Sequence, residues 1–521
     1  MARVTDPAIA PQPATPTPKP EQDHRDTPHS EAFMDFITSG WAPRESLGIT
    51  EDEVAAFSGA RREALSARFP GARLVIPAGS YKVRTGDTDY RFRPHSAFAH
   101  LTGLGLDLEP DAVLVLHPLF ADDDGDGEPQ PVGHEAVLYA RPPSSFESDE
   151  FFADSRYGEY WIGARPMLED LETKTGIPTR NIDGMRDALS KDAGGEVQLL
   201  VVPEADEAVE TLVEAVRLES GAGDPPPGTP TNADLGRATS EIRLVKDAWE
   251  IEQMREAVNQ TIDGFAAIVQ ALPSAVDHAR GERVVETVFD AHARLEGNTV
   301  GYDTIAASGN NATTLHWITN DGPVRPGDLL LVDAGVEVES LYTADITRTL
   351  PVSGTFTAVQ RKVYQAVLDA ADTAFRAAVP GAQFKDVHAA AMDVIAARLE
   401  EWGILPDGIT AAESLEPDCQ YHRRWMVHGT SHHLGLDVHD CAQARASLYK
   451  EGVLTPGMIF TIEPGLYFKS GDLTVPEEYR GIGVRIEDDI LITDNGAENL
   501  SVALPRDPDA VEAWMASLMG A

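Results

Sequence analysis

Four acidic residues lie within or at the ends of apolar, strand-like runs of the sequence. The runs are LLLVDAG (329–335) with Asp333, SLYTADITRTLPVSG (340–354) with Asp345, MIFTIEPGLYF (458–468) with Glu463 and GIGVRIEDDILIT (481–493) with Glu487. An isolated ionised carboxylate in such surroundings costs several kcal/mol unless it is paired or bound to a metal ion. Separate salt bridges would account for any one acid, but the nearby basic residues are only Arg348 and Arg485. We therefore expect one shared cation site.

Four of the 15 histidines lie within HGTSHHLGLDVHD (428–440). The segment HGTSH lacks the glutamate that the helical zinc motif HExxH requires, so that motif does not apply. Its glycines and the alternating LGLDVHD pattern favour a loop that leads into a strand. We assign a structural role to His433 and functional roles to His428, His432 and His439, because a polar cluster beside buried acids favours chemistry.

The charge of the four carboxylates indicates how many cations the site would hold. Together they carry about −4, which two divalent cations would neutralise, and one imidazole would complete the protein ligands. Carboxylate-rich sites prefer hard ions such as Mn²⁺, while an imidazole allows Co²⁺, Zn²⁺ or Fe²⁺. Two ions about 3.5–4 Å apart can share a bridging hydroxide at neutral pH. Such a site would hydrolyse a substrate without a serine or cysteine nucleophile.

Composition excludes several classes of partner. The formal net charge is −43, from 42 basic and 85 acidic residues, which argues against nucleic acid because phosphate binding needs clustered Lys and Arg. No apolar run reaches the roughly 18 residues of a membrane span, and the N-terminus lacks the apolar segment of a secretory signal. The two cysteines, Cys419 and Cys441, fit a reducing compartment. We expect a cytoplasmic protein without a membrane partner.

The first half of the chain is predicted to hold an arm and an α/β domain. Residues 1–45 are expected to be a disordered, Pro-rich arm, and residues 46–220 an α/β N-terminal domain. Its strand-like runs are 72–77, 111–118, 134–140 and 197–203, and its helical patterns include 51–69 and 157–176. The acidic segment 121–133 resembles a calcium loop but has Gly133 where a glutamate is needed, so we interpret it as a solvated loop.

Residues 221–238 are predicted to be a linker, because they begin with GAGDPPPGTP, and residues 239–521 a second domain. Helical patterns cover 240–272 and 280–296, and a strand-like run covers 301–308. Strand patterns follow at 328–351, helices at 355–402 and strands again from 425 to about 504. Blocks of strands and blocks of helices indicate an α+β domain.

The ordered motifs DAG, DITRT, HGxxHxLGLDVHD, IEPG and GVRIEDD resemble those of the dinuclear metallopeptidases of the pita-bread fold, and among them the aminopeptidase P (Xaa-Pro aminopeptidase) family. The resemblance covers about 240–505 and extends to ARREALSARFPGARLVIPAGS and YRFRPHSAFAHLTGL in the first domain. It implies an α+β chain with a C-terminal pita-bread domain, preceded by a smaller α/β domain of the creatinase and prolidase type.

The resemblance implies a role for each site residue. Asp333 would bind one metal ion and Asp345 both, His432 and Glu463 would bind the other ion, and Glu487 would bridge the pair. Glu463 would also handle protons. The residues implied to bind substrate or to assist catalysis are His316, His428, His439 and Arg485. Asp333 and Asp345 are twelve positions apart instead of the family's usual eleven, so we expect an extra residue in the turn EVESLYT or a bulge.

The implied reaction is removal of an N-terminal residue when proline is second, by a homodimer or homotetramer. A prolidase, which cleaves Xaa-Pro dipeptides, shares every metal motif and is the main alternative. A second alternative is a catalytically inactive pita-bread protein that serves as a binding module, although such relatives typically lose ligands and all five are present here.

Overall fold

The computed structural model describes residues 30–106, 110–121, 130–193, 197–221 and 227–520, and its contacts divide the chain into two compact units. One unit consists of the chain up to Gly48 together with residues 143–167, and the other of residues 49–142 and 168–521. In the part of the chain that is described, no helix is long and apolar enough to cross a membrane.

The described residues of the first unit form three short helices: α1 (Glu31–Ile37), α4 (Asp149–Ala153) and α5 (Glu159–Ile162). Trp41 packs on the rings of Phe146, Phe151 and Tyr160 at centroid distances of 5.2–6.4 Å, and Arg44 pairs with Glu159. Residues 30–45 are therefore ordered by aromatic packing, in contrast to the predicted disordered arm. The remainder of that arm, residues 1–29, lies outside the described residues.

The helix predicted over residues 157–176 is divided into α5 and α6 (Leu168–Thr175). Gly163 has φ +89°, a left-handed conformation that a continuous right-handed helix cannot contain, and Pro166 follows it. The periodic pattern was correct, but these two residues interrupt it. The two helices belong to different units.

The N-terminal part of the second unit is built on a five-stranded sheet in the order β6-β5-β4-β1-β7. The edge strands are parallel to their neighbours, β6 to β5 and β7 to β1, whereas β4 is antiparallel to both β5 and β1. The strands are β1 (Arg73–Pro77), β4 (Val113–Phe120), β5 (Pro131–Ala140), β6 (Thr179–Asn181) and β7 (Leu199–Val201), and the hairpin strands are β2 (Val83–Thr85) and β3 (Thr88–Asp89). The helices are α2 (Ala55–Ser66), α3 (Ser96–Thr102), α6, α7 (Met185–Ser190), α8 (Glu207–Glu219) and α9 (Asn232–Glu241).

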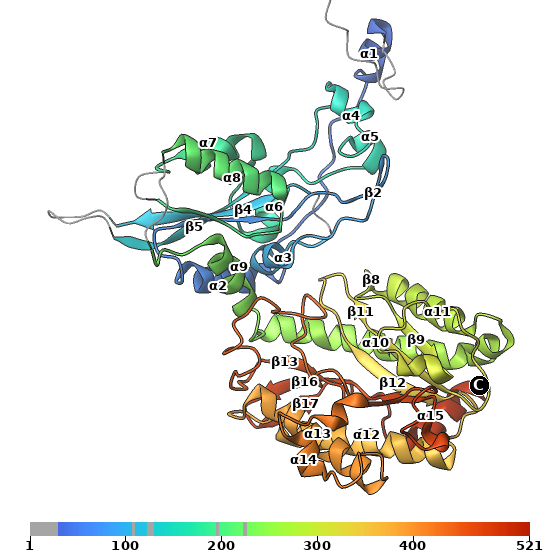
Figure 1. Ribbon diagram of the computed structural model, residues 1–521. Coiled ribbons are helices and arrows are strands. Elements are labelled where there is room, and N and C mark those ends of the chain that lie inside the picture. The colour runs from blue at the N-terminus through green and yellow to red at the C-terminus, as the bar shows by residue number, and fades with distance from the viewer. Residues whose placement is uncertain (1–29, 107–109, 122–129, 194–196, 222–226, 521) are drawn as a thin grey trace, which may run out of the picture. The chain divides into compact units, whose positions relative to one another are not determined.

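Helices cover both faces of this sheet (Figure 1). Alternate strand residues point to opposite faces, so Leu74 and Ile76 pack in one core with Phe98 of α3, whereas Val75 packs in another with Val213 of α8. The predicted α/β layer is confirmed. The acidic segment 122–129 lies outside the described residues, as do residues 222–226 of the predicted linker, and α9 begins within that linker after a capping box at Thr231.

The C-terminal part is α+β, as predicted. Its small sheets have the orders β12-β10-β9, β11-β8, β13-β16-β17 and β14-β15. The strands are β8 (Thr299–Val300), β9 (Ile305–Ser308), β10 (Leu329–Ala334), β11 (Val336–Glu337), β12 (Ile346–Pro351), β13 (Ile459–Ile462), β14 (Gly465–Phe468), β15 (Ile482–Arg485), β16 (Asp488–Thr493) and β17 (Gly496–Asn499). The helices are α10 (Ala248–Asp277), α11 (Gly281–Glu296), α12 (Ala358–Ala377), α13 (Phe384–Glu401), α14 (Ala411–Leu415) and α15 (Pro508–Met519).

These strands lie between two helical layers, with α10 and α11 on one side and α12 and α13 on the other (Figure 1). Leu330 and Val332 of β10 pack in the core that contains Phe265 of α10, while Leu329 and Leu331 pack in the core that contains α12 and α13. The middle strand is thus buried on both faces. Any charged group on it must find its partners inside the protein.

Candidate metal centre

The hairpin of β10 and β12 places two carboxylates on one face. Asp333 lies opposite Thr347 in the antiparallel register, and Asp345 precedes the first residue of β12. Because side chains on one strand alternate between faces, Asp345 and Thr347 point to the same side as Asp333. The connection contains a tight turn in which the Leu341 N–H donates to the Val338 carbonyl oxygen over 2.8 Å, and Leu341 has φ +72°.

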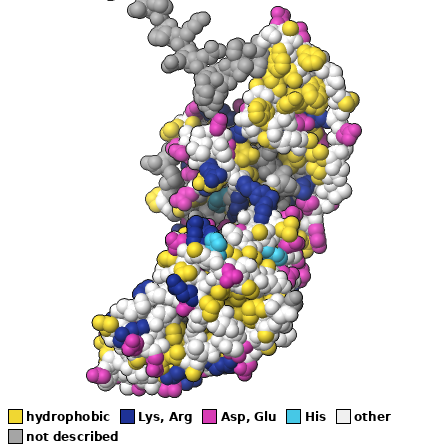
Figure 2. All heavy atoms as spheres, turned by 90° about the vertical axis from the view of Figure 1, so that its right-hand side faces the viewer, with side chains coloured by type: hydrophobic (Ala, Val, Ile, Leu, Met, Phe, Trp, Pro, Cys, Tyr) yellow, Lys and Arg dark blue, Asp and Glu magenta, His cyan; other side chains and the backbone are white. Residues whose placement is uncertain are grey.

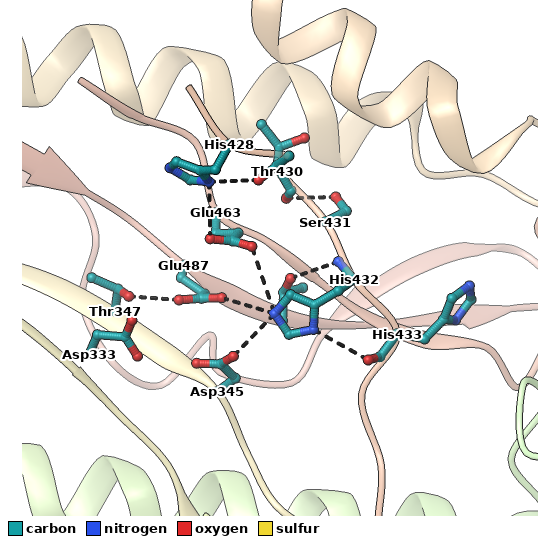
Figure 3. Close-up of polar contacts among 12 residues, drawn as sticks. Asp333, Asp345, Thr347, His428, Thr430, Ser431, His432, His433, Glu463 and Glu487 are labelled. Carbon is teal, nitrogen blue, oxygen red and sulfur yellow. Dashed lines mark hydrogen bonds and ion pairs between the residues drawn. The ribbon is translucent and has the colours of Figure 1, made fainter. Parts of the chain in front are cut away.

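Two further carboxylates lie at the ends of later strands in the C-terminal part of the chain. Glu463 directly follows β13, and Glu487 lies between β15 and β16. His432 is held beside them because the Thr461 N–H donates to its carbonyl oxygen over 2.9 Å. Figure 3 shows the three side chains converging, with Asp333 and Asp345 close by.

Distances from the His432 ring define the centre of the cluster. Its Nε2 atom lies 3.2 Å from Asp345 Oδ2, 3.7 Å from Glu463 Oε1 and 4.0 Å from Glu487 Oε1. Ligand atoms of Asp345, His432 and Glu487 all lie within 4.8 Å of one another. This spacing is that of a site for a cation. Carboxylate oxygens with one imidazole nitrogen are donors that suit divalent first-row metal ions.

The fourth carboxylate is held by neutral and basic neighbours. Asp333 Oδ2 accepts a hydrogen bond from Arg485 Nη2 over 2.5 Å, and the Tyr302 hydroxyl lies 2.6 Å from Asp333 Oδ1 and 2.5 Å from Asp345 Oδ1. Arg485 also donates to the hydroxyls of Thr347 and Tyr467. A single guanidinium thus faces four carboxylates, so the pocket retains excess negative charge.

The pKa values of Glu463, Asp345, Glu487 and His432 reflect this excess of negative charge. Burial raises the pKa of Glu463 to about 8, and burial together with the neighbouring carboxylates raises the pKa values of Asp345 and Glu487. Burial opposes a charge on His432, but its hydrogen bond to Asp345 and the negative charges around it raise its pKa to about 9. Without cations, protons would have to neutralise the pocket, so its donor set and its charge both fit divalent ions.

The histidines implied to contact substrate line the same cavity of about 450 Å³. His428 Nδ1 lies 2.7 Å from the Gly429 carbonyl oxygen and 3.5 Å from Glu463 Oε2, and its Nε2 lies 2.8 Å from the Tyr467 hydroxyl. Burial and the charge of Arg485 lower the pKa of His428 to about 3, so the ring is neutral. The ring of His439 lies edge-on to that of His432 at 4.5 Å between centroids, and His316 lines the cavity wall.

His433 does not belong to this cluster. Its side chain points away from the carboxylates (Figure 3) and stacks on Phe384 at 4.8 Å between centroids. The structure therefore places all nine predicted site residues around one cavity and leaves His433 in the core. One expectation was wrong: residues 425–458 form no strand, and their only β-pairing is two isolated bridges, His433 with Phe460 and Val453 with Gln383.

Sequence reasoning missed four polar residues that hold the site. The Tyr302 hydroxyl donates to Asp333 and Asp345, and the Tyr467 hydroxyl accepts a hydrogen bond from Arg485. Thr347 donates to Glu487 Oε2 over 2.6 Å, and buried Asp489 accepts the Asp345 N–H over 3.2 Å. A signal for Tyr467 was present, because it follows Glu463 by four positions in the run TIEPGLYF. Tyr302 lies outside every strand and gave no such signal.

The comparisons with known proteins agree with this geometry. Residues 252–494 match metallopeptidase family M24, and residues 59–201 match the aminopeptidase P N-terminal domain. The chain is 48% identical over 485 residues to Xaa-Pro aminopeptidase 2 of Streptomyces coelicolor, covering 93% of this chain and 96% of that protein. It is 33% identical over 468 residues to the Xaa-Pro aminopeptidase of Escherichia coli, covering 87% and 96%.

A solved structure of a variant of Escherichia coli aminopeptidase P in complex with substrate matches with a TM-score of 0.73 at 30% identity, covering 91% of this chain and 100% of that one. The fold and site are thus those of an M24 metallopeptidase with an aminopeptidase P type N-terminal domain. The chain belongs to the aminopeptidase P family, the Xaa-Pro aminopeptidases, and the resemblance inferred from its sequence is confirmed.

Proposed function

We propose that this protein is a metal-dependent exopeptidase that removes the N-terminal residue of peptides with proline at the second position. One observation carries the proposal: four carboxylates and an imidazole from distant segments converge on one cavity that the neutral His428 also lines. The relatives are themselves named Xaa-Pro aminopeptidases.

Two divalent ions would suit the pocket, because four carboxylates carry about −4 and, among the described lining residues, Arg485 supplies one permanent positive charge. We assign Asp333 to one ion, Asp345 to both, His432 and Glu463 to the other, and Glu487 to a bridge between them. Mn²⁺ suits this oxygen-rich set best, while His432 allows Co²⁺, Zn²⁺ or Fe²⁺; one matching structure is a zinc-substituted Escherichia coli aminopeptidase P in complex with product. The ions would make a shared water acidic enough to supply hydroxide at neutral pH and would polarise the substrate carbonyl.

The protein's own groups would position the peptide and move its protons. Glu463 would accept a proton during attack and return it to the leaving proline nitrogen. His428 and His439 would hydrogen-bond the substrate carbonyl oxygens and stabilise the tetrahedral intermediate, with His316 helping to bind the peptide. Arg485 would place these groups through its bonds to Asp333 and Tyr467.

Substrate length tests the proposal against the prolidase alternative. With Mn²⁺ present, we expect hydrolysis of Ala-Pro-Ala-Ala with release of alanine, measured by amino-acid analysis alongside the dipeptide Ala-Pro. Activity confined to the dipeptide would establish a prolidase instead.

Metal content tests the binding-module alternative. We expect stoichiometric metal in the purified protein by elemental analysis, and anomalous scattering at the manganese edge from soaked crystals should show two ions among the five ligands. A protein that takes up no metal, even with excess Mn²⁺, would instead be the inactive binding module.

We also propose that the protein is a homodimer or homotetramer that uses its first unit as a contact surface. Hydrophobic side chains are exposed there, including Phe36 at 78% exposure and Tyr160 and Trp161 at 60% each. Figure 2 shows hydrophobic side chains gathered at the top of the face that it presents. A large exposed apolar patch marks a protein interaction site. The unpaired thiols of Cys419 and Cys441 support a cytoplasmic location.

A further inference from the structure

A second cavity, of about 410 Å³, shares one residue with the metal-site cavity. That residue is His439, which lines both. The remainder of the wall comes from residues 80–96 of the N-terminal sheet region and from residues around Arg243 and Asp437. A peptide bound against His439 could therefore continue from one cavity into the other. A volume of this size is within the range of ligand pockets.

The wall of this cavity is cationic in a protein whose formal net charge is −43. Lys82, Arg91, Arg93 and Arg243 line it, against a single carboxylate, that of Asp437. Asp437 is itself engaged, because it accepts a hydrogen bond from Ser96 over 2.6 Å and lies 3.4 Å from Arg243 and 3.7 Å from Arg93. Figure 2 shows Lys and Arg side chains gathered beside histidines on the face that it presents.

The four cations differ in what they already bind. Arg93 pairs with Glu337 over 2.7 Å and Arg243 with Asp440 over 2.9 Å, so both have structural partners. Among the residues that the structure describes, Lys82 and Arg91 form no side-chain hydrogen bond or ion pair, and both are exposed. These two cations are the ones free to bind a ligand.

The backbone holds Lys82 and Arg91 together. Lys82 precedes β2 and Arg91 lies two residues after β3, and these strands form one antiparallel hairpin. The Tyr90 N–H donates to the Lys82 carbonyl oxygen over 2.9 Å, which closes the base of the hairpin beside both residues. Two positive charges at one hairpin base, facing one cavity, favour a carboxylate as ligand.

We propose that Lys82 and Arg91 bind a carboxylate of the peptide substrate beyond the proline, and so give the enzyme a preference for peptides that carry negative charge there. The carboxylate can be the C-terminus of a short peptide or an acidic side chain at the third or fourth residue. The inference rests on the proposed function, because it requires that the substrate proline lies beside His439.

Four peptides separate the two sources of the carboxylate. Ala-Pro-Ala-Ala amide carries none, the free acid of the same peptide carries a C-terminal one, and the amides of Ala-Pro-Glu-Ala and Ala-Pro-Ala-Glu carry a side-chain one. We expect kcat/KM for at least one charged peptide to exceed that of the uncharged amide by about fivefold, as for one exposed ion pair. The difference should lie in KM and should shrink as salt is added.

Charge-removing variants test which residues are responsible. Lys82→Gln with Arg91→Gln should reduce the ratio of kcat/KM between charged and uncharged peptides to about one. Arg84→Gln is the matched control, because Arg84 is an exposed cation on β2 that does not line the cavity, and it should keep the parent ratio. An equal loss in Arg84→Gln would show that only the overall charge matters and would overturn the proposal.

The outcomes distinguish this inference from the function on which it rests. If the uncharged amide is cleaved but the parent enzyme shows no preference for any charged peptide, the inference fails and the proposed function stands. If no peptide with proline second is cleaved by the manganese-loaded protein, the proposed function fails.

Discussion

Nη2 of Arg485 lies 2.5 Å from Oδ2 of Asp333, and both side chains are buried. Among the described residues that line the cavity, Arg485 is the one arginine or lysine, and it also lies 4.0 Å from Glu487. Among the described residues it is the permanent positive charge paired with Asp333, so we expect the pair to stabilise this buried carboxylate when no metal ion is bound.

Replacing Arg485 by Met should destabilise the metal-free protein by about 3 kcal/mol, because it leaves a buried carboxylate without its partner. Bound cations would replace the lost charge, so the destabilisation should be smaller in Mn²⁺ than in EDTA. Chemical unfolding under both conditions measures this, with Arg485→Lys as a charge-preserving control. Equal losses of unfolding free energy in EDTA and in Mn²⁺ would show that the stabilising effect of Arg485 does not depend on metal binding.

Asp345→Asn should leave the protein folded but reduce kcat on the order of 100-fold or more, because it removes a charged ligand assigned to both ions. Its metal content should fall as well. Asp328→Asn is a matched control, since Asp328 directly precedes β10 and does not line the cavity. Near-normal turnover of Asp345→Asn would refute the assignment of Asp345 to both ions.

His439→Ala should keep its metal and lose kcat on the order of 100-fold. His439 forms a ring contact with His432 but no ion pair with any of the four carboxylates. Metal content by elemental analysis, measured together with the kinetics, distinguishes a substrate-binding role for His439 from a role as a metal ligand. Loss of an ion would make His439 a ligand.

The metal-free protein should lose stability as pH rises from about 5 to about 8. Glu463 has its pKa raised to about 8 and His432 to about 9 in the folded state, so the folded protein binds more protons than the unfolded one across this range. The stabilising contribution of His432 is complete below its unfolded pKa and is lost as pH approaches 9.

Bound ions should reverse this trend, because the ligands must be deprotonated to bind them. Unfolding with EDTA and with Mn²⁺ over the same pH range compares the two cases. A metal-free protein whose stability rises with pH would contradict the raised pKa values.

Phe36→Asp should shift the protein toward the monomer, because Phe36 is the most exposed aromatic residue of the first unit. Light scattering after size-exclusion chromatography measures the mass. Leu218→Asp, at a side chain 71% exposed on α8, is the control for adding a charge at an exposed apolar position. An unchanged mass for Phe36→Asp would place the subunit contact elsewhere.

Much of the site could be predicted because a buried acid is visible in a sequence: Asp333, Asp345, Glu463 and Glu487 each interrupt an apolar pattern. The elements that failed depend on information that periodicity does not carry. Gly163 and Pro166 divided a predicted helix, and LGLDVHD alternates like a strand although its polar residues bond other segments, such as Asp440 with Arg243 and Lys246. Tyr302 reaches the acids through the tertiary fold, which no local pattern records.

The pairing of β10 with β12 also bears on how the two aspartates can be identified in related sequences. Their common orientation is set by the ladder position of Asp333 opposite Thr347 and not by the number of residues between them. The turn at Val338–Leu341 lies beyond that ladder, so insertions or deletions there would leave both carboxylates in place. Sequence spacing is consequently a weak criterion for recognising this motif, and alignment of the strands is the reliable one.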